Sequence, residues 1–258
     1  MTYQKTNFPG IAGHQLVMDQ GGEGSQPILF IHGWTCRRDY WVPQMADLAR
    51  DYRVAALDLS GHGESESEGR TDWSVTGLAD DVTAALEALG AEDAVLVGHS
   101  MGGTVALEAA ARTDVVRAVV LVDTFVLPYG DLSEADAQGI ETPFHEDFAA
   151  AMAGLVDNAT GSAMDESTRV RLKREMAAAD TAWALPLWRD LLRWSPEPAF
   201  GALEAPVHAI NGDLIPEPAR QRCAGRVTEW HMPGTGHFPQ MEMPEAFNRK
   251  LREVLAAL

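Results

Sequence analysis

One serine in this sequence stands in a pattern that suits nucleophilic chemistry. Ser100 is the centre of GHSMG, residues 98–102, which fits the spacing G-x-S-x-G. The apolar run DAVLVGHS predicts a strand that leads into the serine, and the alanine-rich run to about residue 112 predicts a helix after it. A sharp turn between strand and helix exposes the hydroxyl at the carboxyl edge of a sheet, where it can act as a nucleophile.

A serine hydroxyl needs a base within hydrogen-bond reach, and the base needs an acid that orients it. His237 lies in GTGHF, residues 234–238, on a glycine-flanked loop after the last predicted strand, and we expect it to be the base. Asp213 and Asp123 each follow an apolar strand, so both are expected at the active edge of a parallel sheet. The chain order Ser100, Asp213, His237 favours Asp213, with Asp123 as the alternative acid.

The remaining parts of a site are an oxyanion hole and a pocket. HGW at residues 32–34 follows another predicted strand, and its glycine lets the next backbone N–H turn toward the serine. We therefore expect the N–H groups of Trp34 and Met101 to hold an oxyanion. Tryptophans near residues 183–194 recur at helical spacing, which is typical of packing onto a core and also of an apolar pocket wall. The substrate pocket is expected to include His32, His99, Phe125, Trp183, Trp188 and Phe238.

Strand and helix patterns alternate over the first half of the chain, which is typical of an α/β fold with a parallel sheet and helices on both faces. From about residue 128 to residue 200 the pattern is helical only, and the alternation then resumes. We expect one structural unit made of a core over residues 1–127, an inserted helical cap over residues 128–200, and the second part of the core over residues 201–258. The predicted strands are 27–33, the apolar part of 52–65, 93–100, 115–124, 205–212 and 226–234.

Composition limits the partners. The formal net charge is −18, and no basic stripe is present that could neutralise phosphates, so nucleic acid and anionic membrane surfaces are excluded as partners. Cys36 and Cys223 have no metal-ligand spacing, and the six acidic residues within 131–147 suit a solvated helix rather than a metal site. With no signal peptide or membrane-length apolar run, we expect a cytoplasmic protein that acts on a small molecule without a cofactor or metal. The oligomeric state is left open.

Taken together, four motifs resemble those of the α/β-hydrolase superfamily over nearly the whole chain. They are HGW for the oxyanion loop, DLSGHGES for the loop after the fourth strand, GHSMGG for the serine turn and GTGHF for the histidine loop. The resemblance implies a mostly parallel sheet with a helical lid between the sixth and seventh strands. It also implies an acid three residues after a glycine that follows the seventh strand. Here Asp213 follows Gly212 directly, and some relatives place the acid after the sixth strand, which keeps Asp123 as an alternative.

The identity of the nucleophile narrows the chemistry that the resemblance implies. Haloalkane dehalogenases and epoxide hydrolases carry aspartate at this turn, so Ser100 disfavours both activities. Serine suits acyl transfer, and the leading hypothesis is hydrolysis of a small carboxylic ester, lactone or thioester through an acyl-enzyme on Ser100. The alternatives on the same fold are a cofactor-free dioxygenase, a hydrolase of carbon–carbon bonds and a non-enzymatic ligand receptor.

Overall fold

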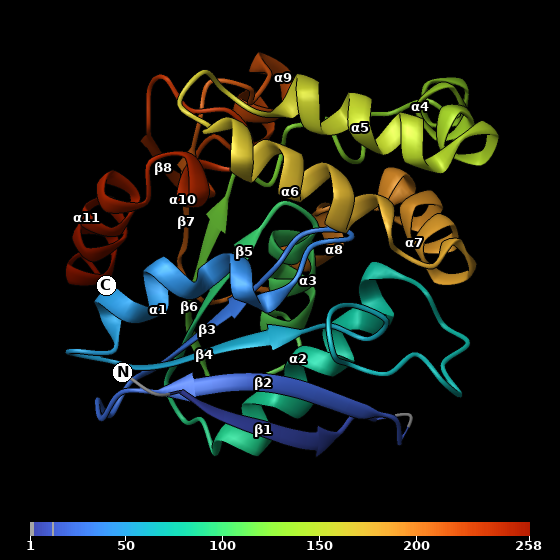
Figure 1. Ribbon diagram of the computed structural model, residues 1–258. Coiled ribbons are helices and arrows are strands. Elements are labelled where there is room, and N and C mark those ends of the chain that lie inside the picture. The colour runs from blue at the N-terminus through green and yellow to red at the C-terminus, as the bar shows by residue number, and fades with distance from the viewer. Residues whose placement is uncertain (1–2, 12) are drawn as a thin grey trace.

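One central sheet forms the framework of the molecule (Figure 1). The computed structural model describes residues 3–11 and 13–258. The strands are β1 (Gln4–Pro9), β2 (Gln15–Gly21), β3 (Pro27–Ile31), β4 (Arg53–Asp58), β5 (Ala94–His99), β6 (Val116–Val122), β7 (Val207–Asn211) and β8 (Val227–His231). They form an eight-stranded sheet in the order β1-β2-β4-β3-β5-β6-β7-β8. Neighbours from β4 to β8 in this order are parallel, and β1 and β2 are antiparallel, so the expected mostly parallel sheet is confirmed.

Helices cover both faces of the sheet because its central strands are apolar on both sides. In β3, Ile28 and Phe30 belong to one hydrophobic core, and Leu29 and Ile31 belong to the other, as the two-residue period of a strand requires. One core contains residues of α1 and α11, and the other contains residues of α2 and α3. The helices are α1 (Val42–Leu48), α2 (Val75–Leu89), α3 (Met101–Ala110), α4 (Glu134–Glu146), α5 (Phe148–Ala159), α6 (Glu166–Ala177), α7 (Thr181–Arg193), α8 (Glu197–Ala202), α9 (Glu217–Cys223), α10 (Pro239–Glu242) and α11 (Pro244–Ala256).

The N-terminal hairpin of β1 and β2 is an element that the sequence patterns did not predict. It joins the sheet through β2, which pairs with β4 from Val17 opposite Asp58 to Gly21 opposite Val54. Leu16 and Met18 of β2 are fully buried, whereas β1 is mostly exposed. Because β1 is short and rich in polar residues, its strand pattern is weak, and it protects the sheet edge without contributing to the site.

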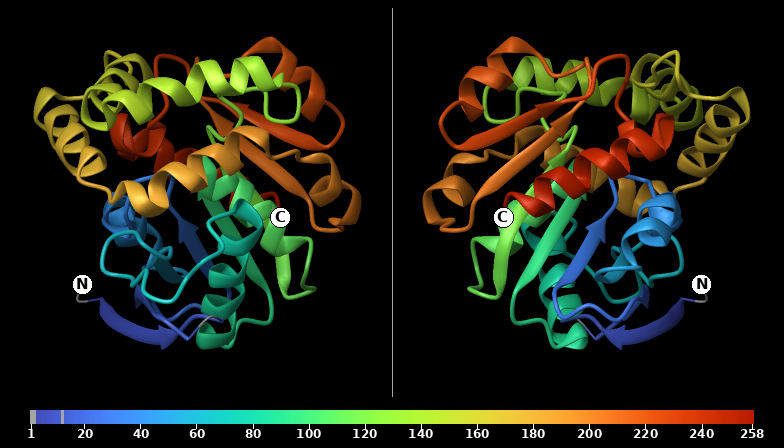
Figure 2. Two further views of the ribbon diagram at one scale, coloured as in Figure 1. Left: turned by 90° about the vertical axis from the view of Figure 1, so that its right-hand side faces the viewer. Right: turned by 90° about the vertical axis from the view of Figure 1, so that its left-hand side faces the viewer.

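Five helices, α4 to α8, separate β6 from β7 along the chain. Figures 1 and 2 show α4, α5, α6 and α7 above the carboxyl edge of the parallel strands. The described residues of this segment contain no strand, in agreement with the helical pattern. Two acidic residues of α4, Glu134 and Glu141, form ion pairs with Arg193 of α7. The division of the chain at residues 127/128 and 200/201 stays a prediction.

Candidate active site

Ser100 occupies a strained turn between β5 and α3. Its backbone has φ 53° and ψ −125°, a conformation that residues with a side chain rarely adopt. The two glycines of the motif make the turn sterically feasible: a Cβ on Gly98 would collide with the carbonyl oxygen of Gly102, and one on Gly102 would collide with the backbone of Ile31 and His32. The turn therefore brings β5, α3 and the loop after β3 into close contact around the hydroxyl.

The structure joins three side chains at the carboxyl edge of the sheet. His237 Nε2 lies 2.9 Å from the Ser100 hydroxyl, and His237 Nδ1 lies 2.8 Å from Asp123 Oδ2. Asp123 is fully buried, and its second oxygen accepts a 2.8 Å hydrogen bond from the Gly212 N–H. In the tautomer that suits a base, Nδ1–H donates to the carboxylate and Nε2 accepts from the hydroxyl. The arrangement has the geometry of a nucleophile, a base and an orienting acid.

The prediction that Asp213 orients His237 is wrong, because Asp123 and not Asp213 bonds to that histidine. Asp213 is half-exposed, and its carboxylate bonds to His231 Nε2 at 2.9 Å and to the Gly234 N–H at 2.8 Å. The Gly234 N–H lowers the pKa of this carboxyl, with a smaller contribution from His231. The reason lies in strand order: β6, which Asp123 follows, pairs directly with β5, whereas β7, which leads to Asp213, lies one strand farther from the serine.

The expected oxyanion donors flank the serine. An added Cβ on Gly33 would lie 3.1 Å from Ser100 Cβ, so the loop that carries Trp34 passes directly beside the nucleophile. Within the described chain, the backbone N–H of Trp34 donates to no protein acceptor. Met101 is the first residue of α3, where an N–H has no partner inside the helix. The Trp34 indole anchors this loop to α7 by a 3.0 Å bond to the Ala184 carbonyl and by stacking on Trp188 at 4.4 Å.

Comparison with known proteins supplies the family. A family model described as "Alpha/beta hydrolase family" matches residues 28–250. The chain belongs to the alpha/beta hydrolase family. A non-heme chloroperoxidase from Streptomyces lividans is 35% identical over 139 residues, covering 52% of this chain and 49% of that protein. A bifunctional esterase/perhydrolase from Acinetobacter calcoaceticus is 35% identical over 132 residues, covering 50% of this chain and 47% of that protein. The matched segment thus spans about half of the length of these curated relatives.

This member of the alpha/beta hydrolase family shares its fold with a solved structure along nearly its whole length. An esterase from Exiguobacterium antarcticum superimposes with a TM-score of 0.87 over 98% of this chain and 100% of that chain, at 17% sequence identity. An identity this low establishes the fold alone. The expected superfamily and the expected fold are both confirmed.

Two buried histidines hold the loop that carries Gly33 and Trp34. His32 Nδ1 lies 2.8 Å from the Gly33 carbonyl, and its Nε2 accepts from the Leu59 N–H at 3.1 Å. His62 Nε2 accepts from the Thr35 N–H at 3.1 Å, and its Nδ1 lies 2.9 Å from a backbone carbonyl. Each ring therefore donates from Nδ1 and is neutral. Burial lowers the pKa of His32 to about 4, and burial together with the neighbouring His32 lowers the pKa of His62 to about 3.

Stability should therefore fall in mildly acidic solution. In the unfolded chain both histidines bind protons below about pH 6.5, whereas in the folded chain they stay neutral down to about pH 4. The unfolded state then binds more protons, and we expect the free energy of unfolding to drop by on the order of 2–4 kcal/mol between pH 7.5 and pH 5. Urea unfolding followed by tryptophan fluorescence measures this slope. The variant His62→Gln should flatten it, while His145→Gln, at an exposed site, should not; equal slopes would contradict the prediction.

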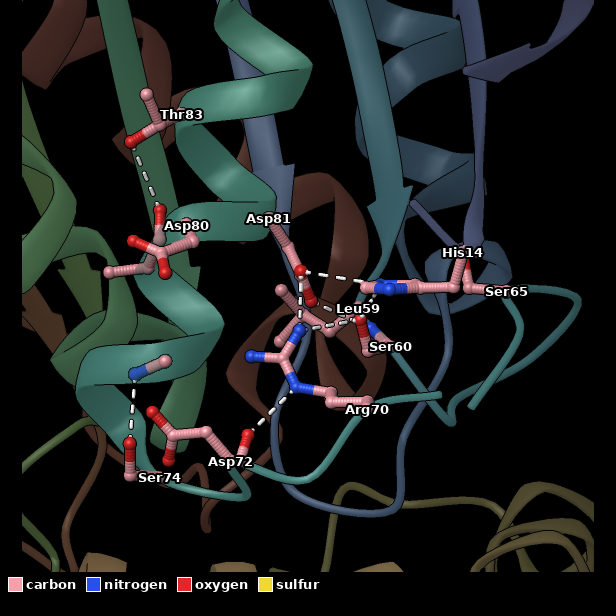
Figure 3. A network of polar contacts seen from close by, with 12 residues as sticks. His14, Leu59, Ser60, Ser65, Arg70, Asp72, Ser74, Asp80, Asp81 and Thr83 are labelled. Carbon is pink, nitrogen blue, oxygen red and sulfur yellow. Dashed lines mark hydrogen bonds and ion pairs between the residues drawn. The ribbon is translucent and has the colours of Figure 1, made fainter. Parts of the chain in front are cut away.

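The loop that carries His62 is fixed by a buried polar network (Figure 3). Asp81 of α2 accepts from the Ser60 N–H at 2.9 Å, and Arg70 donates both to Asp81 at 2.7 Å and to the Ser60 hydroxyl at 2.9 Å. His14 Nε2 lies 2.5 Å from the same hydroxyl and 3.7 Å from Asp81. Serine and aspartate both approach one nitrogen of His14, so this group does not repeat the arrangement around His237. Its effect is to tie the loop after β4 to α2.

A largely apolar cavity of about 570 Å³ opens onto Ser100 and His237. Apolar residues of α4 and α5 line one side of it together with Met176 of α6 and Trp188 of α7, and Asn158 contributes an amide. Among the described residues, no Lys, Arg, Asp or Glu lines it. The cavity suits an uncharged organic ligand.

The predicted pocket was half correct. His99, Trp188 and Phe238 line the cavity. The ring of His32 instead contacts the Gly33 carbonyl and the Leu59 N–H. Phe125 lines a separate cavity of about 210 Å³. Trp183 packs on the ring of His62 at 4.3 Å because it lies about 140° around α7 from Trp188, and only one face of the helix reaches the cavity. The sequence patterns missed the residues of α4 and α5 in the wall, for which no motif gives a signal; they include Ile140, Phe144, Ala151 and Leu155.

Over residues 3–11 and 13–258, no group of three or more His, Cys, Asp or Glu side chains is arranged to hold a metal ion. Within the same residues, no helix has both the length and the apolar character needed to cross a membrane.

Proposed function

We propose that this alpha/beta hydrolase cleaves an uncharged carboxylic ester, lactone or thioester through an acyl-enzyme on Ser100. The observation that carries the proposal is the pair of bonds from Asp123 through His237 to Ser100, at 2.8 Å and 2.9 Å, at one end of an apolar cavity. A histidine held in this tautomer can accept the hydroxyl proton as the serine attacks. The name of the Acinetobacter relative, an esterase/perhydrolase, is consistent with acyl transfer.

The reaction proceeds in two halves. In the first, Ser100 Oγ bonds to the carbonyl carbon while its proton passes to His237 Nε2, and the backbone N–H groups of Trp34 and Met101 bind the oxyanion. One such donor is worth about 3 kcal/mol of transition-state stabilisation. The carbon–oxygen bond to the alcohol then breaks, and the alcohol leaves with the proton from His237. In the second half, His237 takes a proton from water as the water oxygen bonds to the acyl carbon. The bond between that carbon and Ser100 Oγ then breaks, and His237 returns the proton to Oγ, so that the acid leaves and the serine is restored.

Ester turnover with active-site labelling tests this proposal. The protein is incubated with p-nitrophenyl acetate and butyrate, before and after reaction with an organophosphonate, and the adduct is located by peptide mass spectrometry. We expect turnover that stops on labelling, with the adduct on Ser100. Absence of both turnover and adduct would overturn the proposal.

The charge of the cavity should set substrate preference. In the part of the chain that the structure describes, no Lys or Arg lines it, and the chain carries a net charge of −18, so a carboxylate on the acyl chain would be buried without a cationic partner. We expect kcat/KM for mono-p-nitrophenyl glutarate to be at least about 10-fold below that for p-nitrophenyl pentanoate, a neutral ester of equal chain length, which corresponds to ~1.4 kcal/mol. Rates are normalised to hydroxide-catalysed hydrolysis of each ester. Equal or faster turnover of the glutarate would contradict the prediction.

The position of Asp123 favours a second candidate. Cofactor-free dioxygenases that resemble this family place the acid after the sixth strand, and Asp123 follows β6. In that reaction His237 takes the proton of a hydroxylated heteroaromatic ring, the resulting anion reacts with O2, and Ser100 is not acylated. Oxygen uptake with hydroxyquinolones, measured beside ester turnover, separates the two candidates. Oxygen uptake without ester turnover would replace the first proposal by the second.

A further inference from the structure

The loop that carries His237 is bonded to the end of α5, a helix of the segment between β6 and β7. The backbone N–H of His237 donates to the carbonyl of Ala159, the last residue of α5, at 2.6 Å. These residues lie far apart along the chain, and the bond joins the expected base directly to the helical segment. Any shift of the end of α5 therefore acts on the backbone of His237 itself.

Glu242 strengthens the same junction. Its Oε2 accepts from the Gly236 N–H at 2.9 Å and from the Gly161 N–H at 3.1 Å, and its Oε1 accepts from the Phe238 N–H at 3.2 Å. Two of these donors flank His237, and the third lies just beyond α5. The side chain is buried, and within the described residues no Lys, Arg or His lies within ion-pair distance of it. Three backbone N–H groups thus compensate its charge.

The two backbones approach so closely that only glycine fits at the contact. A Cβ on Gly161 would lie 2.5 Å from Glu242 Oε2 and 2.7 Å from the Gly236 nitrogen. A Cβ on Gly236 would collide with the Gly161 nitrogen and would lie 2.5 Å from the Ala159 carbonyl oxygen. A contact this tight leaves no room for independent movement of the histidine loop and the end of α5.

The same helix forms part of the cavity wall. Ala151, Leu155 and Asn158 recur at intervals of four and three residues, which places them on one face of α5, and all three line the cavity with Ala159. A substrate that fills the cavity therefore presses on the helix whose end holds the base.

We propose that Glu242 is a positioning residue that couples α5, and through it the occupied cavity, to the placement of His237. The inference rests on the proposed function, because His237 acts as the base only in that reaction. The coupling predicts that acyl chains which fill the cavity raise kcat and do not only lower KM, since contact with α5 holds the histidine in place. Glu242 transmits this effect and does not itself touch the reacting atoms.

The variant Glu242→Gln tests the coupling, because it keeps the size of the side chain and replaces one acceptor oxygen by a donor that faces a backbone N–H. We expect kcat for p-nitrophenyl acetate to fall about 10- to 100-fold with KM within about 2-fold of wild type. We also expect the ratio of kcat for hexanoate to kcat for acetate to fall toward one. Glu242→Asp, which keeps the charge, should recover part of kcat. An unchanged ratio in folded protein would overturn the proposal.

Matched controls separate positioning from general stability. Asp190→Asn also replaces a carboxylate that accepts from a backbone N–H, since Asp190 accepts from Val75 at 2.8 Å. Asp190 does not line the cavity, so this variant should leave the ratio unchanged.

Gly161→Ala should reproduce the kinetic effect of Glu242→Gln and be non-additive with it. Gly139→Ala, with open space around the new methyl group, should have no effect. If Glu242→Gln does not fold, Gly161→Ala decides, and a wild-type ratio in that variant overturns the proposal.

Failure of the proposed function has a different signature. It would appear as wild-type protein that neither hydrolyses the esters nor reacts with the phosphonate. The structural junction can still be measured in that case, by hydrogen–deuterium exchange of the peptides that contain His237 and Gly161. Faster exchange in both peptides of Glu242→Gln, but not of Asp190→Asn, is expected if Glu242 holds the junction; unchanged exchange contradicts it.

Discussion

Replacing Ser100 by alanine should lower kcat for ester hydrolysis by on the order of 10⁵- to 10⁶-fold, since removal of a serine nucleophile abolishes the acyl-enzyme route and leaves only binding and oxyanion stabilisation. The folded state should persist, because alanine removes a single oxygen from a side chain whose hydroxyl bonds only to His237. The measurements are steady-state kinetics with p-nitrophenyl butyrate and the thermal unfolding midpoint of the same preparation.

The same variant discriminates between the two candidate functions. A dioxygenase that uses His237 as the base keeps most of its oxygen uptake without the serine hydroxyl, whereas an ester hydrolase loses its turnover. Ser67→Ala is the matched control, because Ser67 is exposed and makes no recorded side-chain hydrogen bond within the described chain. Ester turnover by Ser100→Ala within about 10-fold of wild type would contradict the acyl-enzyme mechanism.

The second large effect is expected at Asp123. Asparagine at this position places an amide group against His237 Nδ1, which favours the wrong tautomer of the ring and removes the charge that stabilises imidazolium. We expect kcat to fall about 10³- to 10⁴-fold. Asp123 also accepts from the Gly212 N–H, so the variant is checked for its fold by circular dichroism and urea unfolding.

Asp213→Asn is the control for this prediction. The Asp213 carboxylate is half-exposed, and its hydrogen bonds within residues 3–11 and 13–258 are to His231 and the Gly234 N–H, so we expect kcat within about 2-fold of wild type. If instead Asp213→Asn lost activity and Asp123→Asn kept it, the geometric assignment of the orienting acid would be wrong. The pair thus tests the strand-order argument directly.

The sequence predicted most residues of the candidate site, but not which aspartate bonds to His237. Short motifs located Ser100, His237 and the loop of Trp34, because each requires a glycine or a strand end that leaves a mark in the sequence. The choice between Asp123 and Asp213 required the order of strands in the sheet. Strand order depends on long-range pairing, and no local pattern reports it. Asp123 also has a positive φ of 48°, which the sequence does not reveal.

The cavity wall and the N-terminal hairpin were harder to predict for different reasons. The side of a helix that faces a cavity depends on the angle at which the helix crosses the sheet, so tryptophans at helical spacing could be assigned to the pocket only in part. Trp188 lines the cavity and Trp183 does not. The strands β1 and β2 carry many polar residues and lie at the edge of the sheet, where burial is incomplete and apolar periodicity is correspondingly faint.

The positive φ angles at the site lower the stability of the folded protein. Within the described chain, the non-glycine residues with positive φ are Thr35, which follows Trp34, Ser100, the proposed nucleophile, and Asp123, the proposed orienting acid. Each such conformation costs about 1–3 kcal/mol and persists only because surrounding packing imposes it. Selection for thermal stability alone would favour glycine at these positions. The residues proposed to carry the chemistry therefore reduce the stability of the folded state, and a Ser100→Gly protein, which we expect to be inactive, should be more stable than the wild type.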